Sequence, residues 1–172
     1  QAASGTSGGS SGSPVIDIDG RVVALNAGAN TQAASSFFLP LDRIQRALRM
    51  LQAGEPVTRG TLMTRFEYTP YDELNRLGLT ATTEQEFRRL FPDRTGLLVV
   101  RQIVPGSPAE SRLEPGDILV AVSGEAVAAF TPLAEILDGN VGREVQVTVE
   151  RGGRRLAIDL LVQDLHAVTP DE

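Results

Sequence analysis

The chain has 172 residues, of which 41% are hydrophobic and 22% charged. This composition is typical of a folded protein with one ordinary domain, or a small domain plus part of another. The net charge of −6 argues against a general nucleic-acid-binding surface, and the absence of cysteine excludes disulfides, thiol catalysis and cysteine-ligated metals. No apolar stretch approaches transmembrane length and no signal peptide is visible, so we expect no membrane span and assign no compartment.

The first informative segment is the glycine- and serine-rich run of residues 8–13, which leads into Pro14 and a short apolar stretch. A serine nucleophile must lie on a tight turn with glycines around it, so that its hydroxyl projects and backbone N–H groups converge on one point. Ser11 meets this requirement, with Gly9 beside it. A second register offers Ser7, but only the Ser11 register is followed at the expected distance by Pro14 and a strand.

A flexible linker is the alternative interpretation of such a run. The continuation favours a folded segment, because two β-rich stretches flank the Asp19-Gly20 turn signal and predict a hairpin over residues 14–27. We then expect a short strand at 36–40 and a helix at 41–52, where leucine and isoleucine recur at helical spacing. Glycine and proline in residues 53–58 predict a linker.

The second unit is predicted to run from residue 59 to 164, followed by a tail at 165–172. We expect a first strand at 61–68, helices at 71–79 and 83–91, and a strand at 96–103. Further along we expect a turn entering a short helix at 105–110 and a strand at 118–122. A capped helix at 131–137, with Pro132 at its first position, and strands at 144–151 and 154–162 complete the unit. This order predicts a small, partly open β-barrel capped by helices.

The first unit resembles the end of the protease barrel in the HtrA/Deg family of trypsin-like serine proteases. More narrowly, nearly the whole chain resembles the large fungal members called nuclear mediators of apoptosis and their plant Deg-type relatives. The resemblance rests on four stretches, at residues 6–15, 37–43, 76–79 and 164–171. It implies Ser11 as nucleophile and the N–H groups of Gly9 and Ser11 as oxyanion donors. It also places the wall of the substrate pocket at Asn26, Ala27, Gly28, Ser36 and Phe37.

The second unit resembles a PDZ domain of the HtrA type, on the stretches Val104–Glu110 and Leu113–Leu119. The fold class implied is therefore mainly β with helices: the C-terminal part of a trypsin-like β-barrel followed by a PDZ domain. PDZ domains bind an extended peptide as an added strand at a sheet edge. Here we expect that sheet edge at residues 62–66, opposite the helix that contains residues 133–137. The peptide-binding residues implied are Arg59, Gly60, Thr61, Leu62, Met63, Leu133, Ile136 and Leu137.

The loop at 59–63 departs from the glycine-leucine-glycine-phenylalanine loop that receives a terminal carboxylate in many PDZ domains. We therefore expect internal or autologous peptides in preference to C-terminal ones. A filled groove that serves only as a spacer is the structural alternative.

The catalytic base of the proposed nucleophile is missing from the first unit. A serine nucleophile needs such a base, and the one histidine of the chain, His166, follows the last PDZ strand. Lysine, which replaces histidine in some serine hydrolases, is absent.

The resemblance places the triad histidine and aspartate on the half of the barrel that precedes the nucleophile. We therefore expect this chain alone to be inactive, and the parent protein to be an ATP-independent serine endopeptidase acting on unfolded or extended proteins. The expected partners are the missing N-terminal half of the barrel and further copies of the chain, since the sheet edge at 14–40 is unfinished. Asp17, Asp19 and Asp42 fall where turns and helix starts favour aspartate, so we expect no metal or cofactor.

The alternative from a different class is a non-catalytic PDZ scaffold or a degenerate protease, in which the first unit only packs. Family members are nuclear, chloroplast or periplasmic, and the sequence does not distinguish these compartments.

Overall fold

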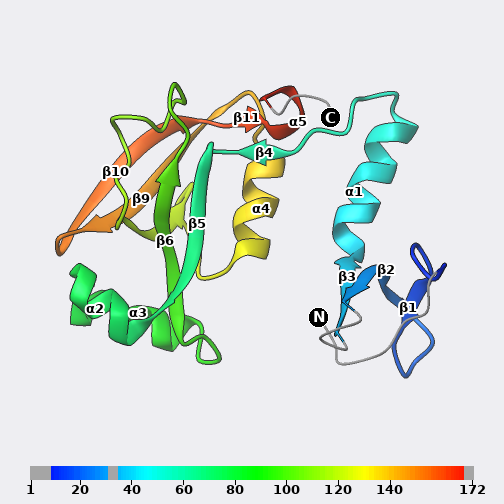
Figure 1. Cartoon of the computed structure of the whole chain (residues 1–172), viewed down its shortest axis with the longest axis horizontal. Coiled ribbons are helices and arrows are strands. Elements are labelled where there is room, and N and C mark those ends of the chain that lie inside the picture. Colours follow the sequence, from blue (N-terminus) through cyan, green and yellow to red (C-terminus); the bar gives the residue numbers. More distant parts are fainter. Residues whose placement is uncertain (1–8, 31–34, 169–172) are drawn as a thin grey trace. The chain divides into compact units, whose positions relative to one another are not determined.

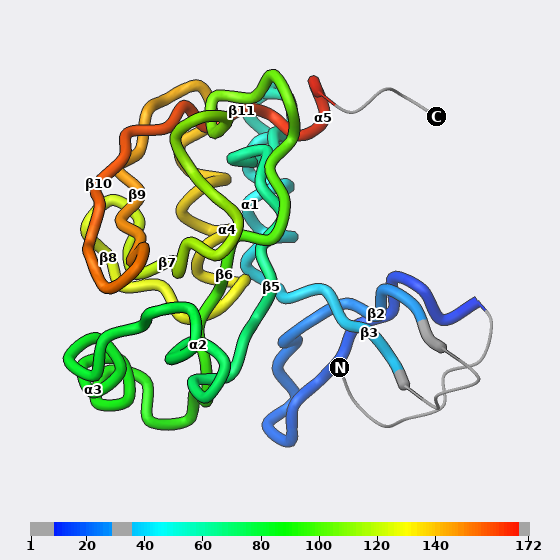
Figure 2. Tube along the Cα trace, turned by 60° about the vertical axis from the view of Figure 1, so that its left-hand side comes forward, coloured from blue at the N-terminus to red at the C-terminus, as the bar shows by residue number. Residues whose placement is uncertain are grey.

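The computed structural model describes residues 9–30 and 35–168, and the chain divides into two compact units, 1–57 and 58–172. The division falls within the stretch 53–58 that the sequence indicates as a linker. Each unit is described by itself (Figures 1 and 2). Among the described residues, no helix is long and apolar enough to cross a membrane.

The first unit is a three-stranded antiparallel sheet followed by a helix. Its strands β1 (Pro14–Ile16), β2 (Val22–Asn30) and β3 (Ser35–Pro40) pair in the order β1-β2-β3, and α1 spans Leu41–Gln52. The predicted hairpin, strand and helix are confirmed. In the hairpin turn Asp17 Oδ1 accepts the backbone N–H groups of Asp19 and Arg21, both at 2.9 Å, and Gly20 takes a φ of 79° that favours glycine.

This first unit has almost no core of its own. Of its residues whose burial is described, three are buried, namely Ala24, Asn26 and Ser36, and α1 has no buried residue. Its apolar side chains are exposed instead, including Ile18 at 104%, Ile16 at 56% and Leu51 at 64%. The sheet is therefore open and leaves apolar surface of the kind that folded proteins cover with other structure.

The second unit is built on a six-stranded sheet with helices on both faces (Figure 1). The strand order is β10 (Arg154–Leu161), β9 (Glu144–Arg151), β7 (Ile118–Val122), β6 (Gly96–Ile103) and β5 (Thr64–Pro70), with β8 (Glu125–Ala126) paired to β7. A separate short ladder joins β4 (Gly60–Thr61) to β11 (Gln163–Asp164). The helices are α2 (Tyr71–Leu77), α3 (Ala81–Leu90), α4 (Phe130–Asp138) and α5 (Leu165–Val168).

Strand β6 is buried on both faces, because alternate side chains enter two different clusters. Leu98 and Val100 belong to the cluster that contains Leu133 and Leu137 of α4. Leu97 and Val99 belong to the opposite cluster, with Tyr71 and Leu74 of α2 and Phe87 of α3. This explains why β6 reads as a continuous apolar run instead of an alternating one. The mainly β fold class with covering helices is confirmed.

Three local predictions for this unit were wrong. The strand expected at 61–68 is two strands, β4 and β5, separated at Leu62 and Met63, where Met63 has a φ of 54° that interrupts extended backbone. Residues 105–110 form turns without a helix, and α4 begins at Phe130, so Pro132 is its third residue. Its N-cap is Ala129, which makes no side-chain cap, whereas the sequence suggested a capped start at Thr131.

A buried carboxylate on strand β9 fixes the start of α3. Glu150 on β9 is 1% exposed, and its two oxygens accept the backbone N–H of Thr80 and the hydroxyl of Thr83. Thr80 is the N-cap residue of α3, and its own hydroxyl accepts the N–H of Thr83. The N–H groups of Thr80 and Thr83 at this helix start are thereby satisfied, and Glu150 joins α3 to the sheet.

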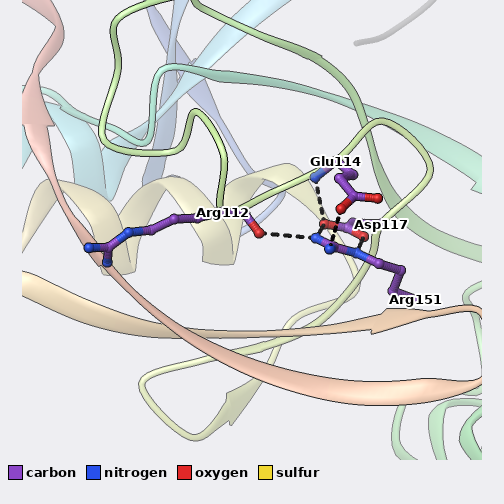
Figure 3. Close-up of polar contacts among 4 residues, drawn as sticks. All are labelled: Arg112, Glu114, Asp117 and Arg151. Carbon is purple, nitrogen blue, oxygen red and sulfur yellow. Dashed lines mark hydrogen bonds and ion pairs between the residues drawn. The ribbon is translucent and has the colours of Figure 1, made fainter.

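A second polar network holds the turn before β7 to β9 (Figure 3). Arg151 donates to both oxygens of Asp117, from Nε at 2.6 Å and from Nη2 at 2.7 Å, and from Nη1 to Glu114 at 2.6 Å. Its Nη2 also donates to the carbonyl of Arg112 at 3.0 Å. The Asp117 side chain is 0% exposed, so the guanidinium supplies the charge that burial requires. These bonds to Asp117 raise the pKa of Arg151.

Replacing Arg151 with methionine leaves Asp117 buried without its counter-charge. We expect Arg151→Met to lower the free energy of unfolding of the second unit by about 3 kcal/mol, at the low end for broken buried pairs because the arginine is partly exposed. Tyrosine fluorescence during urea unfolding reports this unit selectively, since both tyrosines of the chain, Tyr68 and Tyr71, lie in it and tryptophan is absent. Arg154→Met, on the same hairpin and exposed, is the control, and an equal effect of the two variants would contradict the prediction.

The tyrosine of α2 gives this unit an alkaline pH dependence. Burial raises the pKa of Tyr71 above its usual value of 10.0, and its hydroxyl has no hydrogen-bond partner among the described residues. Ionisation is therefore easier in the unfolded chain, so stability is full below pH 10 and falls as the pH rises toward the pKa of the folded state. Lysine titration does not complicate this range, because the chain has no lysine.

We expect Tyr71→Phe to abolish most of that alkaline loss of stability, whereas Tyr68→Phe retains it. Urea unfolding followed by circular dichroism, at pH values on both sides of 10, measures the effect without relying on tyrosine fluorescence. The same pH dependence in both variants would show that burial of Tyr71 is not its cause.

Candidate nucleophile turn and peptide-binding groove

The segment around Ser11 forms the tight turn that its glycines and serines predict. Ser10 O accepts the backbone N–H of Ser13 at 3.1 Å and its hydroxyl at 2.7 Å, which closes a turn around Ser11 and Gly12. Gly12 has a φ of 84° and Gly9 a φ of 93°, conformations that favour glycine. Ser11 is exposed at the tip of this turn.

The turn is tied to strand β2 through Asn26. Asn26 Nδ2 lies 3.1 Å from both the carbonyl and the hydroxyl oxygen of Ser10, and its backbone N–H donates to Ser13 O at 2.9 Å. The Asn26 carbonyl accepts the N–H of Gly12 at 2.7 Å, and the side chain is buried. Sequence reasoning placed Asn26 in the pocket wall and missed this positioning role, although an amide in the middle of a largely apolar strand is a signal for it. Ser7, the alternative nucleophile, lies outside the described residues.

Of the other residues expected in the pocket wall, Ser36 is fully buried, while Ala27 and Phe37 are exposed. Gly28 lies at a break in the pairing of β2 with β3. The single histidine, His166, lies in α5 of the second unit, where its Nδ1 is 3.9 Å from Asp164 Oδ1 and its side chain is 59% exposed. His166 therefore makes a local contact in the unit that does not contain Ser11. Among the described residues, no group of three or more acidic or histidine side chains is arranged to hold a metal ion.

The second candidate site lies where β5 ends the six-stranded sheet. Among the described strands β5 pairs with β6 alone, so its other edge is available to an added strand. Phe66 and Tyr68 of β5 and Ile136 of α4 are half-buried and pack on the same hydrophobic cluster. Leu62, Leu133 and Leu137, also expected to contact the peptide, are 3%, 5% and 5% exposed and pack in the hydrophobic core.

The loop at 59–63 lies against the C-terminal end of α4, and most of its N–H groups have partners within the domain. Gly60 N–H donates to Asp138 Oδ1 at 2.7 Å, and Arg59 N–H to Asp164 Oδ1 at 3.0 Å. Met63 N–H donates to the hydroxyl of Thr61 at 2.9 Å. Sequence reasoning missed the two aspartates, because they are distant in sequence from the loop that they contact.

Gly60 is required here for close packing against the helix. A Cβ at this position would lie 2.1 Å from the carbonyl oxygen of Leu137, a distance at which the backbone must move. The sequence suggested that this glycine permits close approach of a peptide; the structure shows that the close approach is to α4.

We expect Gly60→Ala to lower the free energy of unfolding of the second unit by about 2 kcal/mol, since overpacking against backbone has few routes of relief. The matched control is Gly139→Ala at the end of α4, where a Cβ would lie 3.5 Å from its nearest neighbour, an ordinary contact. Urea unfolding by tyrosine fluorescence compares the two. Equal stability of both variants with the wild type would show that β4 is free to move away from the helix.

Residues 99–151 match the PDZ domain family, and the chain therefore contains a PDZ domain. The match includes β6, β7, α4 and β9, which form the centre of the second unit.

Over its whole length the chain is similar to fungal proteins named pro-apoptotic serine protease NMA111. It is 51% identical to that of Candida glabrata over 172 residues, covering 100% of this chain and 18% of the relative. Identity is 48% to that of Saccharomyces cerevisiae and 50% to that of Aspergillus clavatus, covering 99% of this chain and 17% of each relative. The homologues of this chain are thus HtrA-like serine proteases, as its sequence indicates, and it spans less than a fifth of their length.

Solved structures show the same fold. The HtrA-type protease AlgW with a decapeptide superposes with a TM-score of 0.61 at 16% identity, covering 92% of this chain and 46% of that chain. A second AlgW structure with a decapeptide gives a TM-score of 0.57 at 17% identity, covering 90% and 46%. At this identity the likeness concerns the fold.

Proposed function

We propose that the protein containing this chain is an ATP-independent HtrA-like serine endopeptidase, and that Ser11 is its nucleophile. The observation that carries the proposal is the turn at Ser10–Ser13, which exposes Ser11 between two glycines of positive φ within a sequence similar throughout to named serine proteases. In this proposal residues 1–52 are the C-terminal part of the protease domain, and 59–164 are the PDZ domain.

The reaction assigns a defined role to each part of the turn. The Ser11 hydroxyl oxygen attacks the scissile carbonyl carbon while a histidine takes its proton, and the N–H groups of Gly9 and Ser11 stabilise the oxyanion that forms. The same histidine then returns the proton to the departing amine, and water releases the acyl group. This chain supplies the nucleophile and the donors, whereas the histidine and its aspartate come from a segment outside these residues.

The exposed apolar surface of the first unit indicates that another part of the protein covers its sheet. Ile16, Val22 and Val23 near the hairpin, and Phe37 and Leu39 on β3, are 38% to 56% exposed on a sheet that is too small to bury them. We assign their cover to the N-terminal half of the protease barrel. Further contacts between copies of the protein, in a homo-oligomer, are a finer expectation that rests on the same open sheet.

The PDZ domain supplies the second activity, which is binding of unfolded or extended polypeptide. Its support is the geometry of β5, an edge strand beside α4 whose free edge accepts main-chain hydrogen bonds. The AlgW structures with decapeptides show that this fold occurs in peptide complexes. In this role the groove either holds a substrate near the protease domain or relays the signal of peptide binding to the protease domain.

A second candidate function is a peptide-binding scaffold that has lost catalysis. It is favoured by the single histidine, which makes its contact with Asp164 in the second unit. The two candidates differ in whether the whole protein forms a covalent serine adduct.

Labelling with a fluorophosphonate serine-hydrolase probe separates the candidates. We expect no labelling of this chain alone, because an unactivated serine is a weak nucleophile, and stoichiometric labelling of the full-length protein. Labelling of the full-length protein should be lost in Ser11→Ala and retained in Ser7→Ala, the control within the same segment. Intact mass identifies every labelled species.

Loss of labelling in Ser7→Ala alone would assign the nucleophile to the other register. A folded full-length protein that takes no label, yet binds peptides, would establish the scaffold and overturn the protease proposal.

A further inference from the structure

The part of the PDZ domain expected to receive a peptide's terminal carboxylate already holds two carboxylates of the domain itself. Asp138, at the end of α4, accepts the N–H of Gly60, and Asp164, on β11, accepts the N–H of Arg59. A terminal carboxylate binds such a loop by accepting hydrogen bonds from its backbone N–H groups. Two of the backbone donors of this loop are therefore already bound to carboxylates of the domain itself.

The surroundings of the loop add negative charge and remove space. The loop faces the C-terminal end of α4, which carries the negative end of the helix dipole. The backbone of Gly60 packs directly on the carbonyl of Leu137, so little room remains between loop and helix for an added carboxylate. The short strand β4 is also paired, with β11, and Leu165 N–H donates to Arg59 O at 2.7 Å.

We propose that this PDZ domain binds an internal, extended segment of polypeptide and discriminates against a free C-terminal carboxylate. A terminal carboxylate would enter beside Asp138 and Asp164 as a third negative charge and would have to displace one of them from its N–H donor. Like-charge juxtaposition of this kind is how binding sites reject a competing ligand.

The remainder of the groove needs no peptide terminus. The free edge of β5 offers main-chain donors and acceptors, and half-buried Phe66, Tyr68 and Ile136 offer apolar contacts for alternate side chains. Any extended stretch with suitable apolar residues satisfies these groups. This inference rests on the proposed peptide binding at β5 and specifies the class of peptide.

The test uses the whole 172-residue chain and peptides made as matched pairs. A pooled library of N-acetylated ten-residue peptides is synthesised twice, ending in a free carboxylate or in a carboxamide. Enriched pairs are then measured individually by fluorescence anisotropy. We expect the carboxamide member of each pair to bind more tightly, by about threefold to tenfold, where tenfold corresponds to about 1.4 kcal/mol.

Variants of Asp138 connect the preference to the loop. Asp138→Asn removes the charge and keeps an acceptor for Gly60, whereas Asp138→Ala leaves the Gly60 N–H without this partner. We expect both variants to improve binding of the free-carboxylate peptides by about threefold to tenfold, with the larger gain in Asp138→Ala. Glu135→Gln, the same charge change on an exposed residue of α4, is the control and should alter neither member of a pair.

A measurement without peptide tests the loop directly. Acetate is titrated into ¹⁵N-labelled chain while the amide resonances of Arg59 and Gly60 are followed. We expect no saturable shift in the wild type and a saturable shift of Gly60 in Asp138→Ala.

Each result has a separate meaning. Free-carboxylate peptides binding as tightly as their carboxamide partners or more tightly, or saturable acetate binding at Gly60 in the wild type, would overturn the inference and leave peptide binding intact. Failure of every peptide, in both forms and in all variants, would overturn peptide binding itself and with it the inference.

Discussion

Burial of β6 on both faces is the constraint on which the second unit depends. Because alternate residues of one strand enter two clusters, α2 and α3 must cover one face and α4 the other. Covering both faces leaves backbone groups available at the two end strands of the sheet, β10 and β5, and β5 packs on the same hydrophobic cluster as α4. The groove beside α4 is thus a consequence of how the core is closed, and it requires no special loop to create it.

The first unit lacks an equivalent constraint. Its three strands and one helix bury few side chains among the described residues, so its local order comes from hydrogen bonds in turns. Asn26 fixes Ser10, and Asp17 fixes the hairpin, through contacts that form within the unit. If Ser11 is the nucleophile, as we propose, its turn is assembled within this unit, whereas the base and the structure that covers the sheet would be supplied by other parts of the protein. The turn that presents the serine and the base that would activate it can thus come from different parts of the protein.

The sequence predicted those elements whose signals are local. The Asp19-Gly20 turn, the leucine spacing of α1, the apolar run of β6 and the Gly152-Gly153 hairpin all occur where expected. The errors arose where tertiary contacts decide the backbone. Met63 adopts a left-handed conformation between β4, which pairs with β11, and β5, which pairs with β6, and no local residue type announces this break.

The candidate sites divide in the same way. Ser11 and the loop at 59–63 were found from local motifs, whereas Asp138 and Asp164 were missed because each meets the loop only through long-range folding. These aspartates alter what the motif means. A loop with unpaired backbone donors predicts an anion-binding site. Here two donors of the loop already bind carboxylates of the domain itself, and these carboxylates repel a peptide's terminal carboxylate.

Such an arrangement suits an endopeptidase that acts on extended chains. A groove that requires a C-terminus recognises one position per polypeptide, and that position is seldom the part exposed by unfolding. A groove that reads main-chain groups along β5 and excludes the terminus has many possible registers on each unfolded chain, so its occupancy depends on how much extended polypeptide is present. The two aspartates would then convert a domain that selects particular termini into one that responds to unfolding, without any change in the strand that forms the hydrogen bonds.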